Sequence, residues 1–347
     1  MAVWRRDDSH HPVAHLHGAG VRDDATVRRP GEEGVGRDGG AKLHFGVVTG
    51  YPEEDPTSRS LLRACAALGT ATALAPASIR VEVDGEEGIR LRFGPRPVEE
   101  FDVLLLLRGL GPGGDYDVQL LAYRLLEEEG HLVINSLDAL LSARDKLRTS
   151  ALLARAGVPT PPAAVVQQPG DLADAFARLG SQVIAKPQWG SLGEGIELLH
   201  DDDRGRARAA ELLEDRGALY LQAFVDHGGR DLRLFVVGDR VEAAMERRAP
   251  PDEIRTNLQV GGVGRQIQPD RELREIAVRA ARAIGLDWAG VDVAIGPAGP
   301  TVLEVNGSPG WEGIDRTTRR DMGEAIAWHA ARRANESTGS GTRMEGG

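Results

Sequence analysis

A lysine at the end of an apolar run, followed by several glycines, forms a pattern that can hold phosphate groups. Lys186 closes the run Val-Ile-Ala-Lys, and the loop after it contains Gly190, Ser191, Gly193 and Gly195. Glycines let backbone N–H groups close around phosphate oxygens, and a lysine adds a point charge. In a Walker A loop and in a protein kinase the glycines precede the lysine, so the order here differs from both. A flexible hairpin with an incidental lysine is the alternative.

Two carboxylates and an amide lie on neighbouring apolar runs near the carboxyl end of the chain. Asp292 lies in one run, and Glu304 and Asn306 lie in the next, which a turn at 296–300 joins to the first. Because side chains alternate across a strand, Glu304 and Asn306 share one face and Val305 takes the other. Such oxygen ligands suit Mg²⁺, and buried carboxylates without a cation would be costly. The alternative is an acidic edge that faces solvent.

Arginines and an amide follow on other elements and could bind a carboxylate or a phosphate. Asp231 and Arg233 share a face of one predicted strand, and Arg247, Arg255 and Asn257 come later. The planar guanidinium group favours bidentate recognition of these anions. Taken one by one, these residues could equally form surface ion pairs, which contribute little.

The elements that must position these residues alternate between strands and helices. Strands at 43–48, 101–107 and 131–134, separated by helices at 58–68 and 119–129, predict a parallel sheet in a first domain. The first turn lacks G-x-G-x-x-G, which disfavours a dinucleotide-binding unit. Further elements predict two α+β subdomains. Helices are expected at 145–156, 171–179, 271–284 and 320–331, and strands at 182–186, 219–224, 232–237, 241–245, 289–295 and 301–305.

The predicted organisation has five parts. Residues 1–40 form a disordered extension because they lack apolar periodicity, and residues 333–347 form a disordered tail. Between them lie an N-terminal α/β domain (41–135), a central subdomain with the glycine-rich loop (136–215) and a C-terminal subdomain with the metal site (216–332).

Composition restricts the partners and the compartment. The 42 Lys and Arg against 53 Asp and Glu give a net charge of −11, which argues against binding nucleic acid or an anionic membrane. The longest apolar run, 103–107, is far shorter than the roughly 20 residues of a membrane helix. Cys65, the single cysteine, cannot form an internal disulfide and is expected in the core. We expect a cytoplasmic protein.

Seven short segments, in order, resemble the motif series of ATP-grasp ligases. They are Ala143–Lys146, Val183–Lys186 with its glycine loop, Gln222–Val225, Asp231–Arg233, Arg255–Asn257, Asp292 and Glu304–Asn306. The segment Ser308–Ile314 resembles the signature of the RimK-type branch, the amino-acid and glutamate ligases. The resemblance runs from about residue 43 to 329. It implies an ATP-grasp fold, α/β and α+β, with an N-terminal parallel-sheet (pre-ATP-grasp) domain.

The resemblance also implies roles for the residues of the nucleotide site. Lys146 and Lys186 would contact the phosphates of ATP, Asp231 would bind the ribose, and Arg233 would belong to the same site. The glycine loop would close as a lid. The backbone of the hinge would hold the adenine, and its residues are Gln222, Ala223, Phe224 and Val225. Ala223 departs from the family, in which that position is commonly Glu.

On the reacting side, the resemblance implies metal ligands and catalytic residues. Asp292, Glu304 and Asn306 would hold one or two Mg²⁺ or Mn²⁺ ions. Arg247, Arg255 and Asn257 would face the phosphate and acyl-phosphate groups. Only three of the 42 basic residues are lysine, and two of these fall on phosphate-contact positions. We infer that a guanidinium fork does not fit at those two places.

The implied reaction is ATP-dependent ligation in two steps. A carboxylate attacks the γ-phosphate to give an acyl phosphate, and an amine then displaces phosphate to form an amide. The amine would be L-glutamate or a similar amino acid, and the acceptor is an unidentified small molecule or protein C-terminus. The oligomeric state is open, a homo-oligomer included. The alternatives are a nucleotide-sensing module and a phosphotransferase at the same site, although the chain has no H-R-D or D-F-G series.

Overall fold

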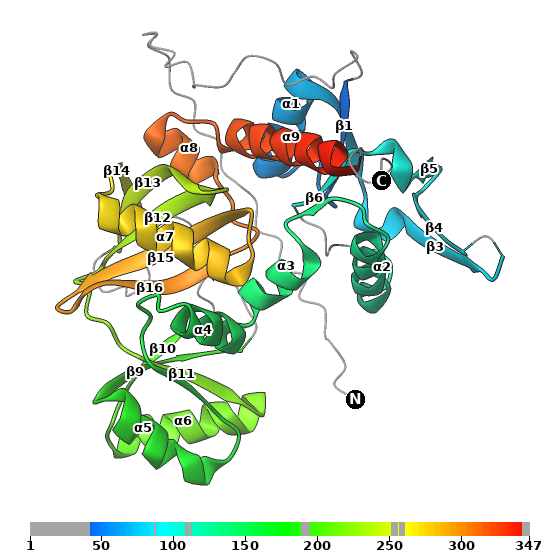
Figure 1. Cartoon of the computed structure of the whole chain (residues 1–347). Helices are drawn as coiled ribbons and strands as arrows, with labels where there is room; N and C mark the ends of the chain where they lie inside the picture. The colour runs from blue at the N-terminus through cyan, green and yellow to red at the C-terminus, as the bar shows by residue number, and fades with distance from the viewer. Residues whose placement is uncertain are drawn as a thin grey trace. The chain divides into compact units, whose positions relative to one another are not determined.

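A parallel sheet opens the fold, as the alternation of apolar runs and helices predicts (Figure 1). The computed structural model describes residues 42–86, 88–107, 111, 113–188, 195–250, 256 and 261–341, with the backbone alone for 338–341. All of these residues lie in one compact unit, 36–347. The predicted extension at 1–40 lies outside the described residues.

The first sheet has the strand order β2-β1-β6-β7, and every pairing in it is parallel. Apolar side chains such as Phe45 and Leu105 are fully buried, which explains why the strands read as continuous apolar runs. The strands are β1 (Leu43–Val48), β2 (Gly69–Leu74), β6 (Val103–Leu106) and β7 (Val133–Ile134), with helices α1 (Pro56–Leu68) and α2 (Tyr116–Glu128).

A small antiparallel sheet, formed by residues that lie between β2 and β6 in the sequence, was not predicted. Its strands are β3 (Ile79–Asp84), β4 (Gly88–Phe93) and β5 (Arg96–Pro97), flanked by the short helices η1 (Pro76–Ser78) and η2 (Val98–Glu100). Leu91 and Phe93 on β4 are buried in the same apolar cluster as the parallel sheet. The sheet is therefore part of the first domain's core.

The central sheet is antiparallel, with the order β10-β9-β11-β8. Helices α5 and α6 cover its apolar face, where Phe176 and Leu221 are fully buried. The elements are β8 (Ala163–Val166), η3 (Pro169–Asp171), α5 (Leu172–Leu179), β9 (Gln182–Lys186), β10 (Glu197–His200), α6 (Asp203–Arg216) and β11 (Leu219–Ala223). The predicted end of the central subdomain at residue 215 is wrong, because β11 pairs with β8 and β9 and so belongs to the central sheet.

The C-terminal sheet is also antiparallel, with the order β14-β13-β12-β15-β16. Helix α7 packs on one face of it, and the buried side chains there are apolar (Figure 1). The elements are β12 (Arg230–Val237), β13 (Arg240–Arg248), β14 (Val263–Gln266), α7 (Arg271–Ile284), β15 (Trp288–Gly296) and β16 (Gly299–Asn306). Helices α3 (Leu137–Arg144) and α4 (Lys146–Arg155) lead from the first domain to these subdomains.

A register shift in the β15–β16 ladder determines which residues of β16 face the core. Asp292 pairs with Glu304, but the next residue, Val293, pairs with Val302, so that Leu303 is an extra residue on β16. Val302 and Val305 are both fully buried as a result, although they are an odd number of positions apart. The predicted split is confirmed, with Val305 in the core and Glu304 on the other face.

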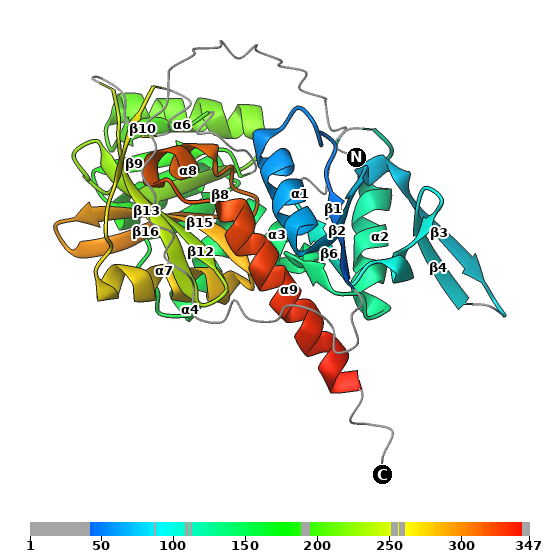
Figure 2. The same cartoon turned by 90° about the horizontal axis from the view of Figure 1, so that it is seen from above.

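In the described part of the chain, the last helix packs on the first. After α8 (Glu312–Thr318), α9 (Met322–Gly341) lies against α1 (Figure 2). A Cβ at Gly323 would lie 2.5 Å from Ser60 Oγ, so the helices approach closely there. The prediction of a disordered tail from residue 333 is wrong for 333–341, because α9 continues to Gly341 and Ala334 is buried. Residues 342–347 lie outside the described residues.

Two expectations from composition concern the core and membranes. Cys65 is fully buried in α1, and burial raises the pKa of its thiol to about 12, which confirms it as a core residue. In the part of the chain that the structure describes, no helix has the length and apolar character needed to cross a bilayer.

Candidate active site

The face of the C-terminal sheet opposite α7 carries a buried row of alternating charges. Asp292 lies opposite Arg233 in the β12–β15 ladder, and Asp231 lies opposite Arg247 in the β12–β13 ladder. Paired residues in antiparallel strands point to the same face, and Asp231 and Arg233 are two positions apart. The register of three strands therefore brings the four side chains together.

The four side chains form an ion-pair network. The Arg247 guanidinium donates to both carboxylate oxygens of Asp231, at 2.8 and 2.5 Å, and lies 2.9 Å from Asp292 Oδ2. Arg233 binds Asp292 with Nε and Nη2, the latter at 2.9 Å from Oδ2. Burial by itself would raise the pKa of Asp292, but Arg233 and Arg247 outweigh it and hold that pKa below its usual value. All three groups are thus charged.

The two lysines that were predicted to bind phosphate are both influenced by Glu304, a carboxylate on β16. Lys186 ends β9, and its Nζ donates to Gln222 Oε1 on the adjacent strand β11 at 2.8 Å. Lys146 is the first residue of α4. Glu304 is the strongest charged influence on both ammonium groups and acts to raise both pKa values. Three sequence-predicted residues from three different elements therefore share one site.

Both lysines have depressed pKa values. Burial lowers the pKa of Lys186, Glu304 partly opposes this, and the nearby charge of Lys146 lowers it further. Burial also lowers the pKa of Lys146, against the influence of Glu304 and Asp145. Two ammonium groups removed from water and close to each other repel and favour a bound polyanion. The arrangement suits the phosphates of a nucleotide.

The hinge segment that was predicted to hold adenine joins β11 to the loop before β12. The Ala223 amide donates to Pro162 O at 2.8 Å and the Phe224 amide to Gln182 O at 3.1 Å. Both of these hinge amides are therefore bonded within the protein. Gln222 is buried, and its side chain accepts a hydrogen bond from Lys186. The adenine contact expected of the Gln222 backbone stays a prediction.

The end of the β15–β16 hairpin fits a hard divalent cation. Glu304 and Asn306 are partly exposed on the polar face, and Asp292 lies opposite Glu304. These are the oxygen donors that Mg²⁺ prefers. The described residues contain no group of three or more His, Cys, Asp or Glu that could hold a metal ion. An amide oxygen and ligands from a bound nucleotide would therefore have to complete the coordination shell.

Several predicted residues fall where the structure gives no account. Arg255, Asn257, Gly190, Ser191 and Gly193 lie outside the described residues, and their roles stay predictions. Gly195, which ends the glycine loop, has φ +65°, a conformation that favours glycine, and its carbonyl accepts from Arg216 at 3.3 Å.

A contact that the sequence does not indicate links the two lysine-bearing elements. Gln188 Nε2 donates to Asp145 Oδ1 at 2.6 Å, and the same oxygen caps α4 by accepting from the Arg148 amide at 2.9 Å. The carboxylate just before Lys146 is thereby tied to the segment just after Lys186. An Asp before a helical run indicates a helix cap, but no signal in the sequence indicates the partner Gln188.

Comparison with known proteins places this geometry in context. A family model described as a RimK-like ATP-grasp domain matches residues 143–329. A relative named "Probable alpha-L-glutamate ligase" from Xanthomonas euvesicatoria pv. vesicatoria is 35% identical over 255 residues, which cover 73% of this chain and 85% of the relative. A relative of the same name from an Enterobacter species is 40% identical over 215 residues, covering 60% of this chain and 70% of the relative.

A solved structure, that of the ATP-grasp ligase PsnB complexed with a minimal precursor, shares the fold. Its TM-score is 0.65 at 22% identity, and the match covers 84% of this chain and 99% of the other. The match extends well beyond the 187 residues of the family model, and so includes elements of the N-terminal domain.

Proposed function

This chain belongs to the RimK-like ATP-grasp family and is an ATP-dependent carboxylate–amine ligase, and we propose that it joins L-glutamate to a carboxylate acceptor. The name of its relatives supports glutamate as the amine. The acceptor is a small molecule or a protein C-terminus. One observation supports the assignment of the site, namely that Glu304 is the largest charged influence on the pKa values of both Lys146 and Lys186.

The chain's own residues would position the phosphates and balance their charge. Gln222 holds the Lys186 ammonium group by a hydrogen bond, and Lys186 would contact a phosphate from there. Lys146, at the start of α4, adds a second charge together with the N–H groups of the first helical turn. Preorganised charges of this kind stabilise the charge that develops during phosphoryl transfer.

Glu304, Asn306 and Asp292 would hold Mg²⁺ at the end of the hairpin. When bound, the ion neutralises phosphate charge and polarises the oxygen that is displaced. The Arg233–Asp292–Arg247 network fixes the Asp292 carboxylate at this end and keeps it ionised. The position of the Asp292 carboxylate would thereby be fixed before a nucleotide binds.

The reaction would proceed without any covalent bond to the protein. The acceptor carboxylate attacks the γ-phosphorus, the bond to the β-phosphate oxygen breaks, and ADP leaves with an acyl phosphate formed. The glutamate amine then attacks the acyl carbon, inorganic phosphate leaves, and one amine proton is released. The protein's contribution is to align the three reactants and to exclude water from the acyl phosphate.

The experiment that tests this proposal measures ADP release with L-glutamate and a panel of carboxylate acceptors. ADP release that needs both substrates, with a product mass equal to acceptor plus glutamate minus water, is the expected result. D-glutamate and L-aspartate serve as matched amines. ATP binding without turnover would favour the sensing module, and transfer of phosphate to the acceptor without amine would favour the phosphotransferase. Extracts incubated with ATP and isotopically labelled glutamate identify the acceptor by mass.

Some finer points rest on the family resemblance and are part of the proposal. We expect Mg²⁺ or Mn²⁺, one or two ions, and a protein that assembles as a homo-oligomer if it follows its relatives. The single cysteine fits a reducing compartment, so we propose the cytoplasm.

A further inference from the structure

Asn135 lies in the first domain, but its side chain forms all its hydrogen bonds with the backbone at the end of the C-terminal sheet. It is fully buried between β7 and α3. Its Oδ1 accepts from the amides of Asp287, at 2.7 Å, and Trp288, at 3.1 Å. Its Nδ2 donates to the carbonyls of Trp288, at 3.0 Å, and Gly307, at 2.9 Å. A side-chain amide has two donors and two acceptor sites, so every one of them is used.

These four contacts bridge the point where two strands separate. Gly290 pairs with Asn306 at the end of the β15–β16 ladder, so continued pairing would bring residue 308 opposite Trp288. Instead β16 has ended, and the Asn135 side chain forms the hydrogen bonds to the Trp288 amide and carbonyl that a neighbouring strand would otherwise form. At the same time Nδ2 holds the Gly307 carbonyl. One side chain therefore determines the spacing between β15 and the residue that follows Asn306.

The segment after Asn306 has little freedom to adopt another position. A Cβ on Gly307 would lie 2.9 Å from Leu286 Cδ2 and 3.2 Å from Ala143 Cβ, so this backbone is closely packed. Ser308 Oγ donates to the Leu107 carbonyl, at the end of β6. Contacts from the ends of β6 and β7 therefore converge on the two residues that follow the last metal ligand.

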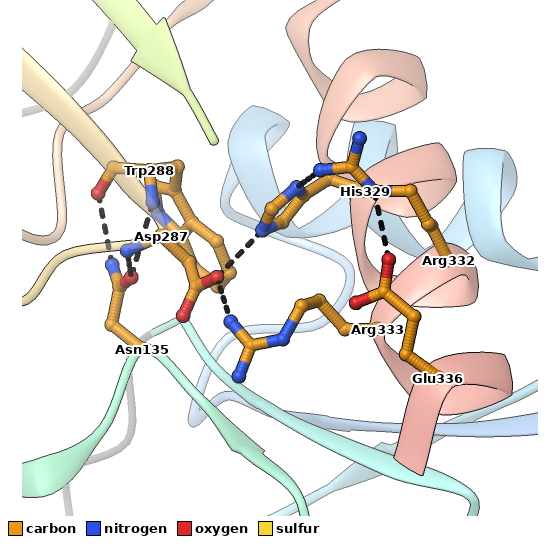
Figure 3. Close-up of polar contacts among 7 residues, drawn as sticks. All are labelled: Asn135, Asp287, Trp288, His329, Arg332, Arg333 and Glu336. Atoms are coloured by element: carbon orange, nitrogen blue, oxygen red, sulfur yellow. Dashed lines mark hydrogen bonds and ion pairs between the residues drawn. The ribbon is translucent and has the colours of Figure 1, made fainter. Parts of the chain in front are cut away.

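The opposite side of the Asp287–Trp288 backbone is fixed by α9 (Figure 3). Asp287 Oδ1 accepts from His329 Nε2 at 2.6 Å and from Arg333. Arg332 donates to His329 Nδ1 at 3.0 Å, so the proton of the neutral ring lies on Nε2. Because α9 also holds this strand start in place, a change at Asn135 should act mainly on its other partner, the Gly307 carbonyl.

We infer that Asn135 is a positioning residue for the metal-binding end of the β15–β16 hairpin, which it places from the first domain through Trp288 and Gly307. The inference rests on the proposed function, because it concerns the same metal ligands, Glu304 and Asn306. Residues that orient metal ligands commonly change metal affinity by about 10- to 100-fold when they are replaced. Asn135 is expected to behave in this way although it does not touch the metal.

The test measures Mn²⁺ binding and not turnover. Mn²⁺ is titrated by electron paramagnetic resonance into the full-length protein with β,γ-imido-ATP present. Asn135→Ala should weaken Mn²⁺ binding by at least about tenfold, with the affinity for the analogue in EDTA changed less than twofold. Asn135→Asp keeps the two acceptor contacts but loses both donors, and should show the same loss even if Asn135→Ala does not fold.

Two matched controls separate positioning from general destabilisation. Thr160→Val removes a hydrogen bond of 3.1 Å to Val302 O, on the same hairpin but nearer its turn. Ser136→Ala removes the cap of α3, next to Asn135 in sequence. Both should bind Mn²⁺ within twofold of the parent protein. Parent-like Mn²⁺ affinity in a folded Asn135 variant would overturn the inference. If the parent protein itself bound no Mn²⁺ with the analogue, the proposed function would fail instead.

Discussion

Asp292 and Glu304 face each other across the β15–β16 ladder, yet Arg233 and Arg247 both bind Asp292. Glu304 instead acts on the two lysines, whose pKa values its charge raises. Two carboxylates that look equivalent in the sequence therefore have different surroundings. Asp292 belongs to a buried ion-pair network, whereas Glu304 can exchange partners when ligands bind. Their substitutions should have different effects.

Glu304→Gln should abolish metal-dependent turnover while leaving the fold intact. The amide keeps the shape of the side chain but removes the charge that a divalent cation needs, so we expect at least a 100-fold loss of kcat/KM for Mg²⁺-ATP. The free energy of unfolding should change by less than about 1 kcal/mol. Steady-state ADP release over a Mg²⁺ titration, together with urea unfolding, measures both. Full activity would remove Glu304 from the metal site.

Asp292→Ala should instead destabilise the protein. It leaves a buried guanidinium group, Arg247, and a partly buried one, Arg233, without one of their counter-charges, which typically costs about 3–5 kcal/mol. Glu275→Ala is a matched control, because Glu275 pairs with Arg271 on the exposed surface of α7 and should cost about 0.5 kcal/mol or less. Equal unfolding midpoints of the two variants in urea would contradict the network's role.

Lys186→Ala should weaken nucleotide binding by about 10- to 150-fold, which corresponds to the 1.5–3 kcal/mol of a charged hydrogen bond. Lys186→Arg should not restore the affinity, because the longer guanidinium fork must replace an ammonium that is packed against Gln222. The exposed Lys42 provides the control, and Lys42→Ala should bind as the parent does. Isothermal titration with ADP measures all three. Unchanged affinity in Lys186→Ala would exclude a phosphate contact.

Asp315 should make stability depend on pH. Burial raises the pKa of this carboxyl to about 7, Asp321 adds to the rise, and Arg63 opposes it. The pKa in the folded protein lies above that of the unfolded chain, so ionisation favours unfolding. Stability should therefore fall as pH rises from about 4 to 7 and then level off.

Because Asp315 is only partly buried, solvent screening should limit this effect to about 1–2 kcal/mol. Asp315→Asn still accepts from the Met322 amide, with which Asp315 Oδ1 forms a hydrogen bond of 3.1 Å, and it should abolish the Asp315 contribution to the slope. Urea unfolding at pH 5 and pH 8 provides the comparison. An identical pH difference in the variant and the parent would show that another group is responsible.

The sequence predicts the site's hairpin well because local signals agree there. Alternation fixes the faces of Glu304 and Val305, and Gly299 marks the turn. Helix α7 was predicted with its observed bounds, because Asp270 caps one end and Gly285 terminates the other. In such segments the local pattern and the packing favour the same structure.

The small sheet of β3 and β4 was missed although its side chains alternate. Val81 and Leu91 face inward, whereas Arg80, Glu82 and Arg90 form ion pairs on the outer face. In the sequence, such closely spaced charged residues resemble a loop. The end of α9 was missed for a related reason. Burial of Ala334 stabilises a helix whose later residues, Ser and Gly, favour a tail by themselves.

The charge network could not be predicted from one sequence. Asp231, Arg247 and Asp292 come from three strands, and only the register of the sheet brings them together. Asp231 and Arg247 are both buried and bind each other in this structure. The ribose contact that the family resemblance implies for Asp231 stays a prediction, and it would require a partner exchange within this network.

The packing of α9 on α1 has a consequence for how the protein is made. Ser60 and Arg63 on α1 both bind Asp321, just before the last helix of the described chain. A ribosome releases α1 well before α9, so the face of α1 that α9 covers stays uncovered until α9 has been made. Nascent chains that stop before residue 321 would therefore present an apolar helix face, and chaperone binding to them should end when α9 emerges.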